Sequence, residues 1–103
     1  MTGPNVCLTF VAGREIRDEL IDHLSEQSDL VPGFTSSDAE GHGPTARLQS
    51  VAEQVKGRAD RVLVRIILND AAAAEVIARA ESAFAGSGLV YWTTPVLSSG
   101  IMA

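Results

Sequence analysis

Residues 61–68, with the sequence RVLVRIIL, form the clearest apolar pattern in the chain. Their alternation predicts a β-strand, because successive side chains of a strand point to opposite faces of a sheet. One face carries four aliphatic side chains, Val62, Val64, Ile66 and Leu68. The other face carries Leu63 and Ile67 beside Arg61 and Arg65. We therefore predict a strand with apolar side chains on both of its faces.

The segment after this strand predicts a helix and a last strand. Asp70 is placed as the helix N-cap, and residues 71–85 carry an apolar stripe at helical spacing. The stripe consists of Ala73, Val76, Ile77, Ala80 and Phe84. The glycine-rich residues 86–88 end the helix, and residues 89–96 form the final strand.

The segment before residue 61 is regular at first and then weakens. Residues 5–11 alternate as a strand does, and residues 14–27 carry a helical apolar stripe. The stripe consists of Ile16, Leu20, Ile21 and Leu24. Residues 34–37 are consistent with an edge strand, and residues 41–44, GHGP, give the strongest loop signal. The weak, polar pattern of residues 41–58 is typical of a functional or mobile loop.

The order of these elements is strand, helix, strand, long loop, strand, helix, strand. It predicts an α+β fold of the ferredoxin-like βαββαβ type, with a four-stranded antiparallel sheet and both helices on one face. At 103 residues the chain has room for a single domain, residues 1–103.

Composition excludes several classes of protein. The chain is 46% hydrophobic and 20% charged, a globular balance, and its net charge of −5 argues against a nucleic-acid binder. Cys7 is the single cysteine, so neither an internal disulfide nor a cysteine-rich zinc site is available. No targeting signal or membrane span is visible in the sequence, so we expect a cytoplasmic protein that does not insert into a membrane.

The apolar residues on both strand faces predict self-association. If the helices cover one face of the sheet, Cys7 and Val11 join Leu63 and Ile67 on the other face. A large exposed apolar patch is uncommon on a monomer, so we expect a homo-oligomer that buries this face. Scattered surface aliphatic residues are the alternative. Tyr91 and Trp92 are expected to pack in the core or at the subunit contact.

Three blocks of sequence in combination resemble a family of small, uncharacterised PII-like proteins. They are residues 30–35 (LVPGFT), residues 52–58 (AEQVKGR) and residues 91–96 (YWTTPV). Residues 23–35 also resemble the end of the first helix and the start of the second strand in PII signalling proteins. Members of the smaller family are often encoded beside heavy-metal efflux pumps.

This resemblance implies a homotrimer whose sheets face one another, with residues 41–58 matching the mobile T-loop that contacts partners. It also implies a metal-efflux or membrane transport protein as partner. PII proteins hold ATP or ADP in the cleft between subunits, using a lysine before the last strand and arginines after it. Here Leu89 and Val90 precede that strand, and Ser98, Ser99 and Gly100 follow it, which weakens the case for ATP binding.

Residues at the foot of the loop are candidates for an anion site. The candidate set consists of Gly41, His42, Gly43, Arg47, Lys56 and Arg58. Arginine, lysine and glycine-rich backbone are the donors that an anion requires. In the alternative interpretation, Arg58, Arg61 and Arg65 pair with Glu53, Asp60 or acids of a neighbouring subunit.

A divalent metal ion is a further candidate effector, since imidazole and carboxylate groups are its usual ligands. His42 is favoured because glycines flank it in the loop, and Glu40 lies two residues away. A polar turn residue is the alternative for His42. The remaining candidates are Cys7, His23, Asp38 and Glu53. Of these, His23 fits a partly buried helix residue and Cys7 a small hydrophobic residue in a strand.

These observations favour a PII-like trimeric regulator without enzymatic activity. It would sense a small effector or metal ion at the inter-subunit cleft and act on a partner through the loop. The alternative is a trimeric metal-binding protein similar to the CutA ion-tolerance family, without signalling. An enzyme has little support, because no nucleophile lies beside a base, and a solvated helix face explains Asp18, Asp22 and Glu26.

Overall fold

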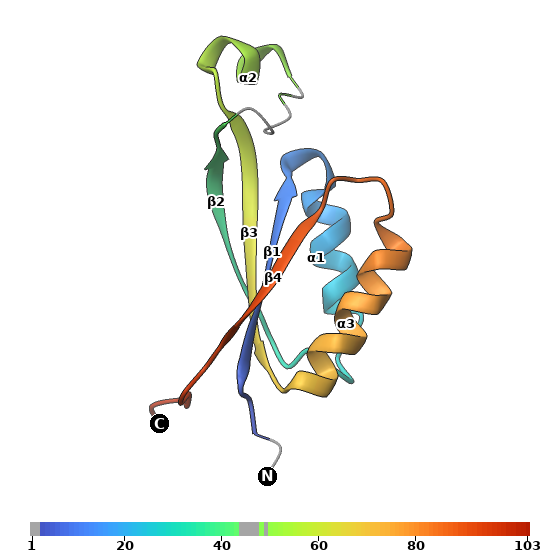
Figure 1. Ribbon diagram of the computed structural model, residues 1–103, viewed down its shortest axis with the longest axis vertical. Coiled ribbons are helices and arrows are strands. Elements are labelled where there is room, and N and C mark those ends of the chain that lie inside the picture. The colour runs from blue at the N-terminus through green and yellow to red at the C-terminus, as the bar shows by residue number, and fades with distance from the viewer. Residues whose placement is uncertain (1–2, 44–47, 49) are drawn as a thin grey trace.

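The computed structural model describes residues 3–43, residue 48 and residues 50–103 (Figure 1). Its elements, in chain order, are β1 (Val6–Gly13), the 3-10 turn η1 (Arg14–Ile16), α1 (Arg17–Ser25), β2 (Thr35–Gly41), α2 (Val51–Lys56), β3 (Ala59–Leu68), α3 (Asp70–Ala83) and β4 (Val90–Pro95). None of the helices in these residues has the length and apolar character needed to cross a bilayer.

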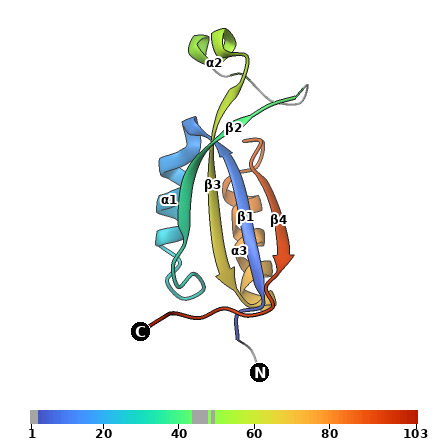
Figure 2. The ribbon, with the colours of Figure 1, turned by 90° about the vertical axis from the view of Figure 1, so that its left-hand side faces the viewer.

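The strands form one four-stranded sheet in the order β2-β3-β1-β4, with every neighbouring pair antiparallel. Helices α1 and α3 lie on the same face of this sheet, and its other face is open (Figures 1 and 2). The predicted ferredoxin-like βαββαβ fold is thereby confirmed, with α2 added between β2 and β3.

The core lies between the sheet and the two long helices. The four aliphatic residues of β3 that were predicted to share one face are all buried, with Val64 and Ile66 at 0% exposure. They pack with Leu8 and Phe10 of β1 and with the helices. The buried helical residues are Leu20 and Leu24 of α1 and Ala73, Val76 and Ala80 of α3. Burial of one such aliphatic side chain contributes about 1.5–3 kcal/mol.

The start of α3 differs from the prediction. Its N-cap is Asn69 rather than Asp70, because the Asn69 Oδ1 atom accepts a 2.8 Å hydrogen bond from the Ala72 N–H. Asp70 is the first helical residue, where its negative charge favours the helix N-terminus. Its Oδ2 atom also accepts a 3.2 Å hydrogen bond from the Asn5 amide.

The predicted helix at residues 14–27 is shorter than expected, and β2 is longer. Residues 14–16 form a 3-10 turn, and α1 ends at Ser25. Strand β2 runs to Gly41 because it pairs with β3 along its whole length, from Thr35 opposite Arg65 to Gly41 opposite Ala59. Most of its side chains are exposed, so it carries no apolar alternation that a sequence pattern could detect.

The open face of the sheet carries the apolar residues that were predicted for it. Cys7, Val11 and Leu63 are half-buried there, and Ile67 is 37% exposed. Strand β4 adds Val90 opposite Val11 and Trp92 opposite Thr9. Val90 is 52% and Trp92 is 44% exposed, so apolar side chains from three strands face away from the helices, interrupted by Arg61 and Arg65 of β3.

Candidate functional site at the foot of the β2–β3 connection

The candidate site lies where the chain leaves β2 and re-enters β3. Glu40 pairs with Asp60 and Gly41 pairs with Ala59, so the two strands stay together to their ends. The segment between them, residues 42–58, is called here the β2–β3 connection. A Cβ atom at position 41 would lie 3.3 Å from the Cγ and Nε atoms of Arg61, so a larger residue there would require the Arg61 side chain to shift.

The β2–β3 connection contains a helix that the sequence analysis did not predict. Helix α2 begins with a capping box, in which the Ser50 hydroxyl accepts a 3.1 Å hydrogen bond from the Glu53 N–H. It ends at Gly57, whose φ of 73° lies in the left-handed region that favours glycine. The signal was present in the sequence as Ser-x-x-Glu followed by a C-terminal glycine.

Glu53 ties α2 to the start of β3. The residue is 4% exposed, and its Oε1 atom accepts a 3.1 Å hydrogen bond from the Ser50 N–H. Its Oε2 atom accepts a hydrogen bond from the Asp60 N–H. A buried carboxylate is stabilised when backbone N–H groups donate to it. Glu53, a candidate metal ligand from the sequence, is therefore used to hold the connection in place.

Glu40 brings together the charged residues at this site. Its Oε2 atom forms an ion pair with the Arg58 Nε atom, and its Oε1 atom lies 3.7 Å from His42 Nε2. The three side chains are half-exposed, at 52% for Glu40, 37% for Arg58 and 65% for His42. One carboxylate therefore bridges the residue that leaves β2 and the residue that enters β3.

The structure places the predicted site residues as follows. Gly41, His42 and Arg58 lie together around Glu40, and Gly43 follows with a φ of 102°. Arg47 lies outside the described residues, and so does the side chain of Lys56. Arg58 pairs with Glu40, rather than with the acids at positions 53 and 60 that the alternative interpretation named. Arg61 NH1 donates to the Asp60 carbonyl at 3.3 Å.

Two of the candidate metal ligands lie close together in the part of the chain that the structure describes. Among the described residues, no group of three or more His, Cys, Asp or Glu side chains could hold a metal ion. His42 and Glu40 remain as a close pair. Asp38 forms a 3.3 Å ion pair with Arg14, and the Cys7 sulfur lies 3.9 Å from the Thr9 hydroxyl. Both of these candidates are therefore engaged with other groups.

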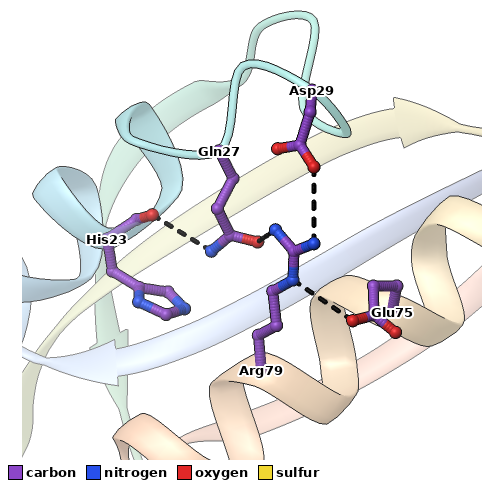
Figure 3. A network of polar contacts seen from close by, with 5 residues as sticks. All are labelled: His23, Gln27, Asp29, Glu75 and Arg79. Carbon is purple, nitrogen blue, oxygen red and sulfur yellow. Dashed lines mark hydrogen bonds and ion pairs between the residues drawn. The ribbon is translucent and has the colours of Figure 1, made fainter.

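A second polar cluster connects α1, the turn after it and α3 (Figure 3). Arg79 donates to Gln27 and Asp29 at 3.3 Å and to Glu75 at 3.2 Å. The hydrogen bond with Asp29 is the largest cause that raises the pKa of Arg79, and Glu75 raises this pKa further. Gln27 is 6% exposed and donates to the His23 carbonyl at 3.0 Å. Three carboxyl and amide partners already surround the guanidinium, so this cluster braces the helices.

His23 is a partly buried helix residue, as predicted. Its ring meets Phe84 edge to face, with ring centroids 5.3 Å apart and an interplanar angle of 89°. Within the described residues, its Nε2 atom is buried without a hydrogen-bond partner. His23 therefore packs between α1 and α3 and does not join His42.

The prediction that Tyr91 and Trp92 pack in the chain's own core is wrong. Tyr91 is 46% exposed and lines a cavity of about 180 Å³ between α3 and β4. Trp92 points to the open face, because it lies opposite Thr9. The alternative, that these aromatic residues lie at a subunit contact, stays a prediction.

Comparisons with known proteins agree with this geometry. The family described as "Protein of unknown function (DUF3240)" matches residues 2–103. The chain is similar to the crystal structure of a DUF3240 family protein from Shewanella baltica OS155, with a TM-score of 0.78 and 18% identity over 97% of this chain and 98% of that one. No protein of curated function matches the chain.

Two further solved structures are PII-like. CPII from Thiomonas intermedia K12, a nitrogen regulatory PII-like protein bound to ADP, AMP and bicarbonate, has a TM-score of 0.68 and 13% identity over 95% of this chain and 97% of that one. A putative PII-like signaling protein from Thermus thermophilus has a TM-score of 0.63 and 15% identity over 93% of this chain and 90% of that one. At these identities the likeness establishes a common PII-like fold.

Proposed function

Because this chain belongs to the DUF3240 family and has a PII-like fold, we propose that it is a PII-like regulatory protein. In this proposal three copies assemble through their open sheet faces. Each cleft between copies takes a small effector or a divalent metal ion, and the β2–β3 connection acts on a partner. The observation that carries the proposal is Glu40, which holds Arg58 and lies beside His42.

The position of Arg58 explains how an effector at Glu40 would reach the β2–β3 connection. Arg58 directly follows Gly57, the C-cap of α2, and directly precedes β3. Loss of its ion pair with Glu40 would release one of the ties between α2 and the sheet. Ordering and release of a segment by a bound ligand is an established form of switching.

A divalent cation is the effector that best fits the side chains at Glu40. Imidazole and carboxylate together suit zinc and copper, and His42 Nε2 lies 3.7 Å from Glu40 Oε1. A cation bound by this pair would repel the guanidinium that now neutralises the same carboxylate. Metal binding and the Glu40–Arg58 ion pair would therefore compete, with water or a neighbouring copy completing the coordination.

This competition predicts opposite effects for two substitutions. Arg58→Gln removes the competing cation, and a partly exposed charge pair of this kind is worth up to about 1 kcal/mol, so metal affinity should rise up to about fivefold. His42→Ala removes a ligand and should weaken affinity about tenfold or more. Calorimetric titration of Zn(II) and Cu(II) into each variant measures both effects.

Arg79→Gln is the matched control for the arginine substitution. Arg79 has the same 37% side-chain exposure as Arg58 and also pairs with carboxylates, but it lies in the brace between α1 and α3. The Arg79→Gln variant should bind metal with the same affinity as the unmodified chain. If His42→Ala binds metal unchanged, the site is elsewhere, and if the unmodified chain binds none, metal sensing is refuted.

An adenine nucleotide is the second candidate effector, favoured by the fold shared with CPII, which was crystallised with ADP and AMP. Arg58 and Arg61 are described cations at the foot of the connection; Arg58 is engaged with Glu40, and Arg61 donates to the Asp60 carbonyl. Native mass spectrometry with ATP, ADP, AMP, Cu(II) and Zn(II) separates the candidates. If the trimer binds three nucleotides, a nucleotide replaces the metal ion as the proposed effector. If it binds metal alone, the metal ion remains the proposed effector.

The CutA-like alternative uses the same Glu40 and His42 pair, with the metal as cargo and without signalling. The two functions differ in whether metal changes the β2–β3 connection. Faster proteolysis or hydrogen exchange of residues 50–58 in the presence of metal supports regulation. An unchanged rate together with tight metal binding supports ion tolerance. For a regulator, the resemblance to proteins encoded beside efflux pumps makes an efflux component the proposed partner.

A further inference from the structure

The last residues of the chain present apolar side chains to water. Residues 97–103, with the sequence LSSGIMA, follow β4 and contain no charged side chain. Leu97 and Met102 are 100% exposed, and Ile101 is 96% exposed. Single exposed aliphatic residues are ordinary, but three fully exposed ones within seven residues indicate a surface that another molecule covers.

The start of this tail is fixed, and its direction is defined. The Val96 N–H donates a 2.9 Å hydrogen bond to the Asn5 carbonyl, which holds the tail at the end of the sheet. From there the tail runs away from α1 and α3, toward the side of the open sheet face (Figures 1 and 2). It therefore extends into the space that a second copy stacked on this face would occupy.

The open face is chemically suited to an apolar tail. Along the sheet it presents Leu63 and Ile67 of β3 together with Val90 and Trp92 of β4, and Arg61 and Arg65 of β3 lie on the same face. No acidic residue occupies an open-face position of the four described strands, since the facing positions of β2 are Thr35, Ser37, Ala39 and Gly41. The tail brings no cationic side chain against Arg61 and Arg65, and its aliphatic side chains can pack on the apolar residues beside them while the guanidinium groups reach water.

The area of the open face is too small to hold two copies together by itself. Four strands about 4.8 Å apart, with 6–10 residues each at about 3.3 Å per residue, cover about 500 Å². A stable interface buries about 800 Å² on each partner. In a trimer the face is shared between two neighbours, so the deficit is greater. The three exposed tail side chains supply roughly 300 Å² more, at roughly 100 Å² each.

We propose that residues 97–103 dock against the open sheet face of a neighbouring copy, with Leu97, Ile101 and Met102 as the anchoring side chains. Each copy would thus contact the next copy through its own residues 97–103. This inference rests on the trimer of the proposed function, but it adds a claim about which residues hold that trimer together.

The test is a triple variant that makes the tail polar, Leu97→Ser with Ile101→Ser and Met102→Ser. The matched control is Val51→Ser with Val55→Ser, which removes two side chains of α2 that are also 76% and 83% exposed. Native mass spectrometry and sedimentation equilibrium measure the mass of each variant. Emission from Trp92, the single tryptophan, reports burial of the open face.

We expect the unmodified chain and the control variant to be trimers. The tail variant should have a dissociation constant at least about tenfold higher, and its Trp92 emission should be red-shifted. A tail variant that stays trimeric with unchanged emission overturns the docking proposal and leaves the trimer standing. A monomeric unmodified chain refutes the trimer itself. Far-UV circular dichroism checks folding, and the double variant Ile101→Ser with Met102→Ser replaces the triple one if that chain misfolds.

Discussion

Two glutamates of the same sequence segment have different surroundings and different roles. Glu53 is buried and accepts hydrogen bonds from backbone N–H groups, which fixes the geometry of α2. Glu40 is half-exposed and pairs with side chains, which a ligand can displace. A backbone hydrogen bond to a buried carboxylate is costly to break, whereas an exposed ion pair is worth at most about 1 kcal/mol.

This difference predicts the effect of removing the buried glutamate. Glu53→Ala abolishes the capping box and leaves the Asp60 N–H without that acceptor, so it should lower the free energy of unfolding by about 2–3 kcal/mol. Urea denaturation measures the change. Glu81→Ala, on the exposed side of α3, serves as control and should stay within about 0.5 kcal/mol. A loss at Glu53 no greater than the control would show that α2 is not held by this carboxylate.

The positions of individual residues were predicted where the spacing of nearby residues specifies them. They were missed where they depend on a residue that the fold brings near. The buried face of β3 was predicted because alternation alone specifies it. Asn69 and Asp70 are both good N-caps, and the hydrogen bond from the Ala72 N–H to the Asn69 side chain, which a sequence pattern does not show, identifies Asn69. The Glu40–Arg58 pair joins residues far apart in the sequence, and only the pairing of β2 with β3 brings them together.

At the scale of elements, periodic segments were predicted closely, whereas the aperiodic β2 was predicted only in part and α2 was missed. Helix α3 and strands β1, β3 and β4 carry apolar residues at regular spacing, and their approximate positions were predicted. Strand β2 is nearly all polar, so pairing with β3 rather than composition makes it a strand. Helix α2 has six residues, which is too short for an apolar stripe, and its capping box was its one local signal.

The pairing of β2 and β3 to their ends predicts that the connection can be shortened. Deleting residues 43–55 leaves His42, Lys56, Gly57 and Arg58 between Gly41 and Ala59, enough for a hairpin loop. Far-UV circular dichroism and native mass spectrometry should show a folded trimer, and partner binding should be lost. If the shortened chain no longer forms a trimer, the connection is structural and not a recognition element.

At the scale of the whole molecule, the sheet has one face covered by helices and one face open. The sequence predicted this arrangement, because β1 and β3 carry apolar residues on both faces while the helices have a single apolar stripe each. The number of copies depends on contacts between chains, which no pattern within one chain specifies.

The open face predicts how the assembly responds to a charge. Ile67→Glu should shift the proposed trimer toward monomer, because a carboxylate placed in the contact between copies would lose its hydration there. The fold of the chain should persist, since Ile67 is already 37% exposed. Sedimentation equilibrium measures the shift. Val51→Glu is the control, and equal behaviour of the two variants would argue against the open face as the interface.

The hydrogen bond between Val96 and Asn5 has a consequence for how many contacts a partner can make. It places the start of β1 and the end of β4 at one end of the sheet, and α2 lies at the opposite end (Figure 1). Three copies aligned by a common axis would present three α2 tips side by side. Linked weak contacts can exceed a single one by about 10²–10⁴ in avidity, so each tip needs only a modest affinity for a partner with repeated sites.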